Sequence, residues 1–208
     1  MTDADARESL TDRLSRKTDV AERVLDAVRA VPRHEFVPEE HRDAAYEDRP
    51  LPIGDGQTVS APHMVAVMCD RLSLPEGDHT LEIGTGCGYH AAVTAELVGA
   101  ENVFSVEYSE SLAADARGNL EHAGYGDVSI RIGDGRTGWS EHAPYDAAYF
   151  TCAAPEFPDP VISQVREGGR LLAPLGDHHQ TLTYAEKTDD GIDRSELSPV
   201  RFVRIRGE

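Results

Sequence analysis

A short apolar strand followed by three alternate glycines constrains this chain more than any other stretch: residues 81–89 read Leu-Glu-Ile-Gly-Thr-Gly-Cys-Gly-Tyr. A helix-forming stretch, residues 90–98, follows at once. Glycines at such a turn let the backbone bend tightly and let a ligand approach where a Cβ would stand in the way. The following helix directs free N–H groups and its positive dipole end at the same spot. The pattern therefore predicts a nucleotide-type pocket at the carboxyl end of a parallel strand.

The spacing of the glycines distinguishes two classes of nucleotide. A dinucleotide-binding loop has the pattern Gly-x-Gly-x-x-Gly, but the residue three positions after Gly86 is Tyr89. The pattern Glu-x-Gly-x-Gly-x-Gly resembles instead the first motif of class I S-adenosyl-L-methionine (SAM) methyltransferases. A glycine triplet is also compatible with a purely structural turn, so the interpretation depends on the rest of the chain.

The length of the chain and its lack of long apolar runs narrow the class of protein. A chain of 208 residues fits one α/β domain with a sizeable core. We expect a single domain over residues 1–208, with residues 1–76 as an N-terminal extension that covers the site and residues 77–208 as the SAM-binding core. The polar, acidic start and the absence of any apolar run near ~18 residues predict a soluble, cytoplasmic protein.

The net charge of the chain is strongly negative. Its 38 acidic residues against 20 basic ones give a formal charge of −18, and only two of the basic residues are lysines. Such a surface repels nucleic acid and anionic membranes, so neither is an expected partner. An acidic, lysine-poor composition resembles that of proteins from salt-loving organisms, in which salt screens self-repulsion. A merely acidic protein of a mesophile is the alternative.

The spacing of cysteines and histidines indicates no metal site. Cys69, Cys87 and Cys152 are far apart and odd in number, which favours reduced thiols over a disulfide framework. None of the nine histidines stands in a His-x-x-x-His pattern or at ligand spacing from a cysteine. A Gly-x-Ser-x-Gly elbow is also missing from the sequence, so the local pattern marks no serine as a nucleophile.

The first amphipathic pattern predicts a helix over residues 19–31. Thr18 or Asp19 can cap this helix, and Pro32 ends it. Residues 33–38 are expected to follow as an irregular packed connection. The apolar face of the helix is formed by residues at i, i+4, i+5 and i+8, namely Val20, Val24, Leu25 and Val28.

A second segment, residues 45–64, combines turn formers with large apolar residues that a solvated linker would not need. Its Asp55-Gly56 pair is a hairpin-type turn signal. Apolar residues at helical spacing begin at Met64. Ser60 precedes an Ala-Pro pair, and the local pattern by itself therefore indicates a helix N-cap at this serine.

Residues 48–64, Asp-Arg-Pro-Leu-Pro-Ile-Gly-Asp-Gly-Gln-Thr-Val-Ser-Ala-Pro-His-Met, resemble the signature of protein-L-isoaspartate O-methyltransferases. The resemblance spans roughly residues 20–176, and in that family the serine of Ser-Ala-Pro-His, here Ser60, is assigned to the active site. The tail departs from the family pattern because Arg204 replaces a proline, which can alter the flanking residues accepted in a peptide. The further motifs that carry the resemblance are residues 81–89, 133–135, 153–155 and 168–171.

The second half of the chain supplies the other elements of a nucleotide-binding sheet. A strand over residues 102–107 ends at Glu107, 25 residues beyond Glu82, where nucleotide-binding folds place a carboxylate for ribose hydroxyls. A solvated strand end is the alternative for this acid. A strand over 128–132 delivers Gly-Asp-Gly to its carboxyl end. The remaining predictions are a helix over 110–123, strands over 145–151 and 170–175, and an antiparallel edge pair over 180–186 and 200–205.

The resemblance implies an α/β, Rossmann-like class I methyltransferase fold with a mostly parallel central sheet flanked by helices, antiparallel C-terminal edge strands and an N-terminal helical extension. It implies that Ser60 is the catalytic residue and that Asp134 reaches the adenine amino group. The implied SAM-binding residues are Glu82, Gly84, Thr85, Gly86, Gly88, Glu107, Asp134 and Gly135. The implied substrate-binding residues are Thr58, Val59, Ser60, His63, Ala154 and Val203.

The activity that the resemblance implies is methyl transfer from SAM to the free α-carboxylate of L-isoaspartyl residues in damaged proteins and peptides, which starts repair through a succinimide. That carboxylate has a pKa of about 3.5 and is already ionised at neutral pH, so the enzyme needs to align it and needs no general base. Ser60 would hold one carboxylate oxygen while the other attacks. A monomer is expected. The alternatives are a class I methyltransferase with a small-molecule or RNA substrate and a non-catalytic SAM-binding module.

Overall fold

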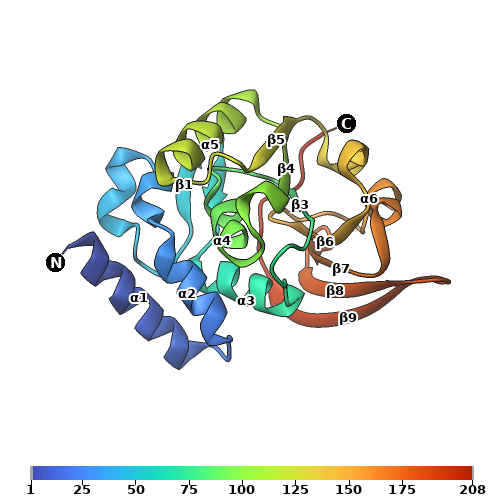
Figure 1. The fold of residues 1–208 in the computed structure, drawn as a ribbon, viewed down its shortest axis with the longest axis horizontal. Helices are drawn as coiled ribbons and strands as arrows, with labels where there is room; N and C mark the ends of the chain where they lie inside the picture. Colours follow the sequence, from blue (N-terminus) through green and yellow to red (C-terminus); the bar gives the residue numbers. More distant parts are fainter. Residues whose placement is uncertain (1, 208) are drawn as a thin grey trace.

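The computed structural model describes residues 2–207 and contains one large sheet, a small hairpin and surrounding helices (Figure 1). The α-helices are α1 (Asp3–Lys17), α2 (Glu22–Ala30), α3 (Pro62–Leu72), α4 (Tyr89–Val98), α5 (Glu110–Ala123) and α6 (Asp159–Gln164). The strands are β1 (Leu51–Gly54), β2 (Gln57–Val59), β3 (Thr80–Ile83), β4 (Val103–Glu107), β5 (Ser129–Ile132), β6 (Tyr145–Phe150), β7 (Val165–Leu175), β8 (Gln180–Thr188) and β9 (Gly191–Val200). Short 3-10 helices are η1 (Arg33–Phe36), η2 (Glu39–Ala44), η3 (Ala100–Asn102), η4 (Gly135–Thr137) and η5 (Ser140–His142).

The large sheet has the strand order β5-β4-β3-β6-β7-β8-β9. Strands β5 to β7 in this order pair in parallel, whereas β8 and β9 are antiparallel edge strands. The predicted Rossmann-like fold is thereby confirmed. The chain leaves β3 toward β4 on one side and returns to β6 on the other, so the strand order reverses between β3 and β6. Open α/β sheets bind ligands at the carboxyl ends of the strands at such a point.

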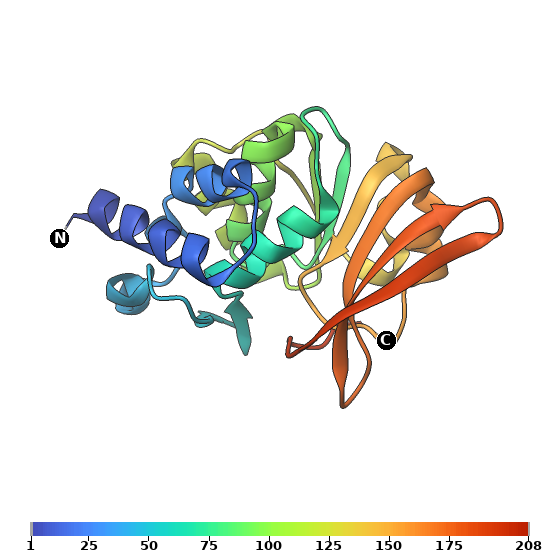
Figure 2. The same cartoon turned by 90° about the horizontal axis from the view of Figure 1, so that it is seen from below.

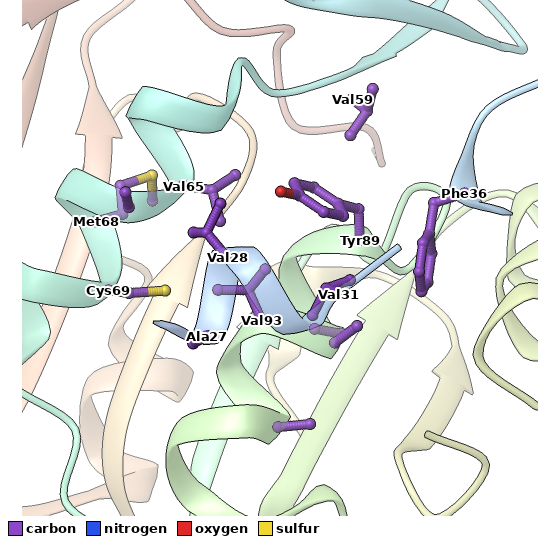
Figure 3. Packing of buried hydrophobic residues seen from close by; sticks show 14 of the residues in the cluster. Ala27, Val28, Val31, Phe36, Val59, Val65, Met68, Cys69, Tyr89 and Val93 are labelled. Atoms are coloured by element: carbon purple, nitrogen blue, oxygen red, sulfur yellow. The ribbon is translucent and has the colours of Figure 1, made fainter. Parts of the chain in front are cut away.

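The N-terminal helices lie at the opposite end of the molecule from β7, β8 and β9 (Figures 1 and 2). Helix α1 packs on α2, and α2 packs on both α3 and α4. Figure 3 shows this packing, with Val28 of α2 near Val65 of α3 and Val93 of α4. The N-terminal extension is therefore part of the hydrophobic core and is held directly against the helix that follows the glycine loop.

The start of the chain differs from the sequence prediction. Helix α1 was not predicted, because only a narrow stripe that includes Leu10 and Leu14 is buried on an otherwise polar helix. The predicted cap at Thr18 or Asp19 is wrong, since Thr18 ends α1 and α2 begins after Ala21. The N-cap of α2 is Ala21, which has no side-chain cap bond; its backbone N–H donates to Asp70 of α3 at 3.0 Å and ties the start of α2 to α3.

The C-terminal edge also differs from the prediction. The antiparallel pair exists, but its second strand is β9 and not residues 200–205. Most of β9 is exposed and polar, so no alternation of apolar residues marked it. Residues 201–206 form an extended tail in which Arg204 bridges to Ala153 beside the carboxyl end of β6. The tail therefore reaches the edge of the sheet where the predicted site lies.

The remaining predicted elements agree closely with the structure. Strands β3 and β4 and helix α5 occupy the expected residues, and the hairpin β1–β2 turns at Asp55 and Gly56. Asp55 has a left-handed backbone (φ +53°), which aspartate tolerates better than most residues. Between residues 2 and 207, no helix is long and apolar enough to cross a membrane.

Candidate functional site

A cavity of about 510 Å³ lies at the predicted position and is called here the switch-point cavity. Its floor consists of residues at or just after the carboxyl ends of β3, β4 and β6, namely Gly84, Gly86, Glu107, Tyr108, Thr151 and Cys152. Other lining residues come from the β1–β2 hairpin (Ile53, Gln57, Thr58), from Gly135 and from the C-terminal tail (Val203 to Arg206). Segments far apart in the sequence thus enclose one space.

The glycine loop needs its first glycine for steric reasons. Gly84 has φ +99°, and a Cβ at this position would lie 2.4 Å from Oγ1 of Thr151. The hydroxyl of Thr151 donates to the carbonyl oxygen of Gly84, which joins the loop to the end of β6. Any side chain at position 84 would therefore push the two floor segments of the cavity apart.

Glu107 lies where the spacing predicted an acid, and its carboxylate holds the loop. Oε2 accepts the backbone N–H of Gly86 at 2.9 Å, and Oε1 accepts that of Ser109 at 2.9 Å. A carboxylate offers about four acceptor positions, so two remain for ligand hydroxyls. The residue is almost fully buried, lines the cavity and is not the solvated strand end that was the alternative.

Glu82 does not line the cavity but lies behind the loop with 0% of its surface exposed. Its Oε2 accepts the Ser105 hydroxyl at 2.5 Å and its Oε1 accepts the Tyr149 hydroxyl at 3.0 Å. Ser105 also contacts Oγ1 of Thr85 at 2.5 Å, so the network extends into the loop. Burial raises the pKa of Glu82 to about 8, although the hydrogen bonds from Ser105 and Tyr149 oppose this shift.

The buried Glu82 predicts a pH dependence of stability. Its pKa is about 8 in the folded state against an ordinary value of 4.5, so folding favours the protonated form. This contribution is complete below about pH 4.5 and is lost as the pH rises toward about 8. We expect a loss of up to ~1.4 kcal/mol per pH unit in that window and none of this loss in Glu82→Gln. Denaturant titrations at several pH values measure the free energy of unfolding of both proteins. If this free energy depends on pH in the same way in the unmodified protein and in Glu82→Gln, the raised pKa does not belong to Glu82.

Three other predicted cofactor residues occupy different positions around the loop. Gly135 lines the cavity, and a Cβ there would lie 2.4 Å from Cγ2 of Ile83. Asp134 does not line it; a hydrogen-bonded ion pair with Arg136, at 2.8 Å, lowers the pKa of this aspartate. Gly88 is the N-cap of α4 and also lies outside the cavity lining. The adenine contact of Asp134 therefore stays a prediction.

A second cavity of about 630 Å³, called here the acceptor cavity, adjoins the first. Thr58, Thr151 and Val203 line both. The other lining residues are Pro50, Ser60, Ala61, His63, Met64, Arg201 and Phe202. Four of the six predicted substrate residues (Thr58, Ser60, His63 and Val203) thus meet around one space. Thr85 and Val59 line a smaller neighbouring cavity, and Ala154 is buried and lines none of the three.

Ser60 is not a helix cap. The N-cap of α3 is Ala61, and this helix end has no side-chain cap bond. The local interpretation of Ser60 is therefore wrong: proline at the first helical position sets the helix start one residue later. The hydroxyl of Ser60 has no hydrogen-bond partner among residues 2–207 and lines the acceptor cavity, so it can donate to a ligand there.

His63 is oriented by a carboxylate. Asp48 Oδ1 accepts from the backbone N–H of His63 at 3.0 Å and contacts Nδ1 of its ring at 2.7 Å. The other oxygen of Asp48 pairs with Lys17 of α1 at 2.5 Å. Burial pushes the pKa of Asp48 upward, but the hydrogen bonds from Lys17 and His63 outweigh it and lower that pKa overall. The Nε2 edge of the imidazole is left as the edge available to a ligand.

The sequence analysis missed the residues that close the switch-point cavity. Arg206 of the tail pairs with Asp55 of the hairpin at 2.5 Å and lies over the Tyr108 ring, 5.4 Å from its centroid. Tyr108 directly follows Glu107 and could have been inferred from that position. Arg206 carried no local signal, because its contacts depend on the path of the tail across the sheet edge.

The described residues form no metal-binding cluster and offer no activated thiol at the two cavities. Within the described part of the chain, no three His, Cys, Asp or Glu side chains gather in a metal-binding arrangement. The three cysteines are buried as free thiols, and burial raises the pKa of Cys152 to about 12. Although Cys152 lines the switch-point cavity, its thiol is therefore not a ready nucleophile.

Comparisons with known proteins agree on one family. The family model described as Protein-L-isoaspartate(D-aspartate) O-methyltransferase (PCMT) matches residues 5–208. Protein-L-isoaspartate O-methyltransferase 2 of Archaeoglobus fulgidus is 51% identical over 204 residues, which cover 97% of this chain and 93% of that protein. The protein-L-isoaspartate O-methyltransferase of Methanothrix thermoacetophila is 55% identical over 190 residues, which cover 91% and 90% of the two chains.

Solved structures give the same result. A protein-L-isoaspartate O-methyltransferase has a TM-score of 0.90 and 33% identity; the match covers 97% of this chain and 66% of that longer one. A putative protein-L-isoaspartate O-methyltransferase from Plasmodium falciparum, in complex with S-adenosyl-L-homocysteine, has a TM-score of 0.85 and 26% identity over 96% and 98% of the chains.

Proposed function

The chain belongs to the protein-L-isoaspartate(D-aspartate) O-methyltransferase family, and from this premise we propose how its two adjoining cavities divide the reaction. The protein is a SAM-dependent methyltransferase that acts on L-isoaspartyl residues. The switch-point cavity takes SAM, and the acceptor cavity takes the isoaspartyl residue of a damaged protein or peptide. The observation that carries this division is the shared wall of Thr58, Thr151 and Val203, across which a donor and an acceptor can meet.

The switch-point cavity fits a nucleoside-containing methyl donor. Its walls are apolar at Ile83, Val106 and Leu112, while Glu107 retains free acceptor positions for ribose hydroxyls. Gly84 and Gly86 both have positive φ angles and carry no Cβ, so a ligand can approach the backbone at the floor of the cavity closely. When bound, SAM supplies an electrophilic methyl group. Glu82 and Thr85 support this loop through the hydroxyl of Ser105.

Ser60 holds the acceptor. The isoaspartyl α-carboxylate has a pKa of about 3.5, so no side chain has to remove a proton from it at neutral pH. The Ser60 hydroxyl donates a hydrogen bond to one carboxylate oxygen and leaves the other free to react. Thr58 and His63 line the same cavity and restrict the orientation of the peptide. Alignment of this kind contributes up to ~7–11 kcal/mol in favourable systems.

The position of the new methyl group tests this arrangement. An ester of the isoaspartyl α-carboxylate is attacked by the following backbone nitrogen and closes to a succinimide with loss of methanol. We expect mass spectrometry of a methylated isoaspartyl peptide to show gain of one methyl group and then conversion to the succinimide at mildly alkaline pH. A methylated peptide that is stable at this pH would contradict methylation of the α-carboxylate.

We propose that the enzyme is a monomer and that residues 1–76 and 77–208 form one domain. We also propose that it works in the cytoplasm of a salt-adapted organism. The salt adaptation is supported by the composition, which has 38 acids, 20 bases and only two lysines. The substrates are isoaspartyl-containing proteins and peptides, with no role for nucleic acid or membranes, because the net charge of −18 repels both.

A salt requirement follows from this composition. Salt at 1 M screens charges beyond ~3 Å, which removes most of the self-repulsion of an acidic surface. We expect circular dichroism to show loss of structure, and assays to show loss of activity, when the protein is diluted from molar salt into low salt. A fully folded, active enzyme in dilute buffer would contradict the halophilic origin.

A further inference from the structure

Arg33 of η1 is a charged side chain with 0% of its surface exposed. Its Nη1 donates to the carbonyl oxygens of Ala45 and Glu47, at 2.6 and 3.3 Å. Its Nη2 donates to those of Arg49 and Ser60, at 3.2 and 3.0 Å. One guanidinium therefore binds four backbone carbonyls of the segment 45–60, which lines the acceptor cavity and ends at Ser60.

The same guanidinium contacts the helix that follows the glycine loop. Its central carbon lies 5.3 Å from the centroid of the Tyr89 ring. Phe36 of η1 contacts the same ring edge-on, with 5.9 Å between the ring centroids; Figure 3 shows these two rings side by side. Tyr89 is the first residue of α4 and lines the small cavity that also borders Ser60, Thr85 and Gly86. Arg33 thus joins the segment 45–60 to the helix that follows the glycine loop.

The chemistry of this position is specific to arginine. Burying an ionised group is costly unless its donors are satisfied. Among residues 2–207, no carboxylate pairs with Arg33, and its Nε is buried without a hydrogen-bond partner, so the two Nη atoms make all of its hydrogen bonds. Carbonyl dipoles and an aromatic face compensate for the lost water. The planar fork of a guanidinium can reach four carbonyls at once, whereas a lysine ammonium has three donors on a single nitrogen.

We propose that Arg33 is the positioning residue for Ser60: it sets the distance between the Ser60 peptide and α4, and with it the alignment of the acceptor carboxylate over the glycine loop. This inference rests on the proposed role of Ser60. Arg33 touches neither cavity and acts only through the backbone it binds.

Arg170 provides a matched control. It also binds backbone carbonyls, those of Leu72 at 2.8 Å and Ser73 at 2.5 Å, and it pairs with Asp78. It anchors the end of α3 to β7 and lines neither cavity. Arg33→Lys removes a fully buried guanidinium fork, and Arg170→Lys removes one whose side chain is only 14% exposed, so a general loss of stability affects both variants. Only the first change loosens the segment 45–60.

Three measurements at a temperature where each variant is folded test the proposal. We expect SAM affinity by calorimetry to stay within about twofold in both variants. We expect kcat on an isoaspartyl peptide to fall ~100-fold in Arg33→Lys, because misplacement by about 1 Å costs rates of that order, and to stay near the original value in Arg170→Lys. Hydrogen exchange should quicken over residues 45–60 in Arg33→Lys alone.

Tyr89→Leu provides a second variant that keeps all four carbonyl bonds and removes the ring beneath the guanidinium. It should lower kcat in the same direction by a smaller factor. Equal loss of kcat in Arg33→Lys and Arg170→Lys, or unchanged hydrogen exchange over 45–60, would overturn the positioning role. If Ser60→Ala keeps full turnover while Arg33→Lys does not, Arg33 does not act through Ser60. If the unmodified enzyme leaves the peptide unmethylated, the proposed function itself fails before any variant is compared.

Discussion

Glu107→Ala is expected to weaken SAM binding by ~100-fold or more. Hydrogen bonds to a charged group contribute ~1.5–3 kcal/mol each, and two acceptor positions for ribose hydroxyls are lost. The same change also frees the backbone N–H of Gly86, which Glu107 holds at 2.9 Å, so the glycine loop loses its anchor. Both effects act on the same cavity, and the fall in affinity is therefore larger than a ribose contact alone would produce.

Calorimetric titration with S-adenosyl-L-homocysteine measures this effect without turnover. Glu110→Ala is the matched control, because Glu110 is an exposed acid three residues further along, at the start of α5. We expect the control to bind with nearly the original affinity. Equal affinities for the unmodified protein and Glu107→Ala would remove Glu107 from the cofactor site.

Ser60→Ala is expected to lower kcat ~10- to 100-fold while leaving SAM affinity nearly unchanged. The hydroxyl lines the acceptor cavity, and a hydrogen bond to a carboxylate is worth ~1.5–3 kcal/mol. The melting temperature should stay the same, because Ser60 caps no helix. A lowered melting temperature with normal turnover would restore the capping interpretation that the local sequence favoured.

An exposed serine supplies the control for this comparison. Within residues 2–207, the hydroxyl of Ser15 on α1 makes one hydrogen bond, to the carbonyl oxygen of Asp12 at 3.0 Å, and Ser15 lines neither cavity. Ser15→Ala should leave kcat, KM and SAM affinity at their original values. A similar fall of kcat in both variants would show that the loss does not come from the acceptor cavity.

The glycine loop and its strand could be predicted because several independent sequence signals indicate the same structure there. An apolar strand, alternate glycines and a helix start follow one another within residues 80–98, and β3 and α4 form where these signals lie. Glu107 was predictable for a related reason, since the end of the next strand has a fixed place in such sheets. Local pattern and topology point to the same position in both cases.

Other parts of the site depend on contacts that local patterns do not contain. Helix α1 buries only a narrow stripe, and β9 is too polar for its alternation to show. Arg33 stands in a stretch that was interpreted as a packed connection, yet its four carbonyl partners are 12 to 27 residues away. A buried arginine of this kind is visible only once the path of the backbone is known.

The central claim is tested most directly with two peptides that differ at one residue, L-isoaspartyl in one and normal L-aspartyl in the other. An isoaspartyl α-carboxylate is attached directly to Cα, whereas an aspartyl carboxylate stands at the end of a CH₂ arm. An acceptor cavity that fixes the peptide backbone can therefore align only one of them. With labelled SAM in high salt, we predict a base-labile methyl ester on the isoaspartyl peptide and essentially none on the aspartyl peptide. Equal labelling of both peptides, or of neither, would contradict the account.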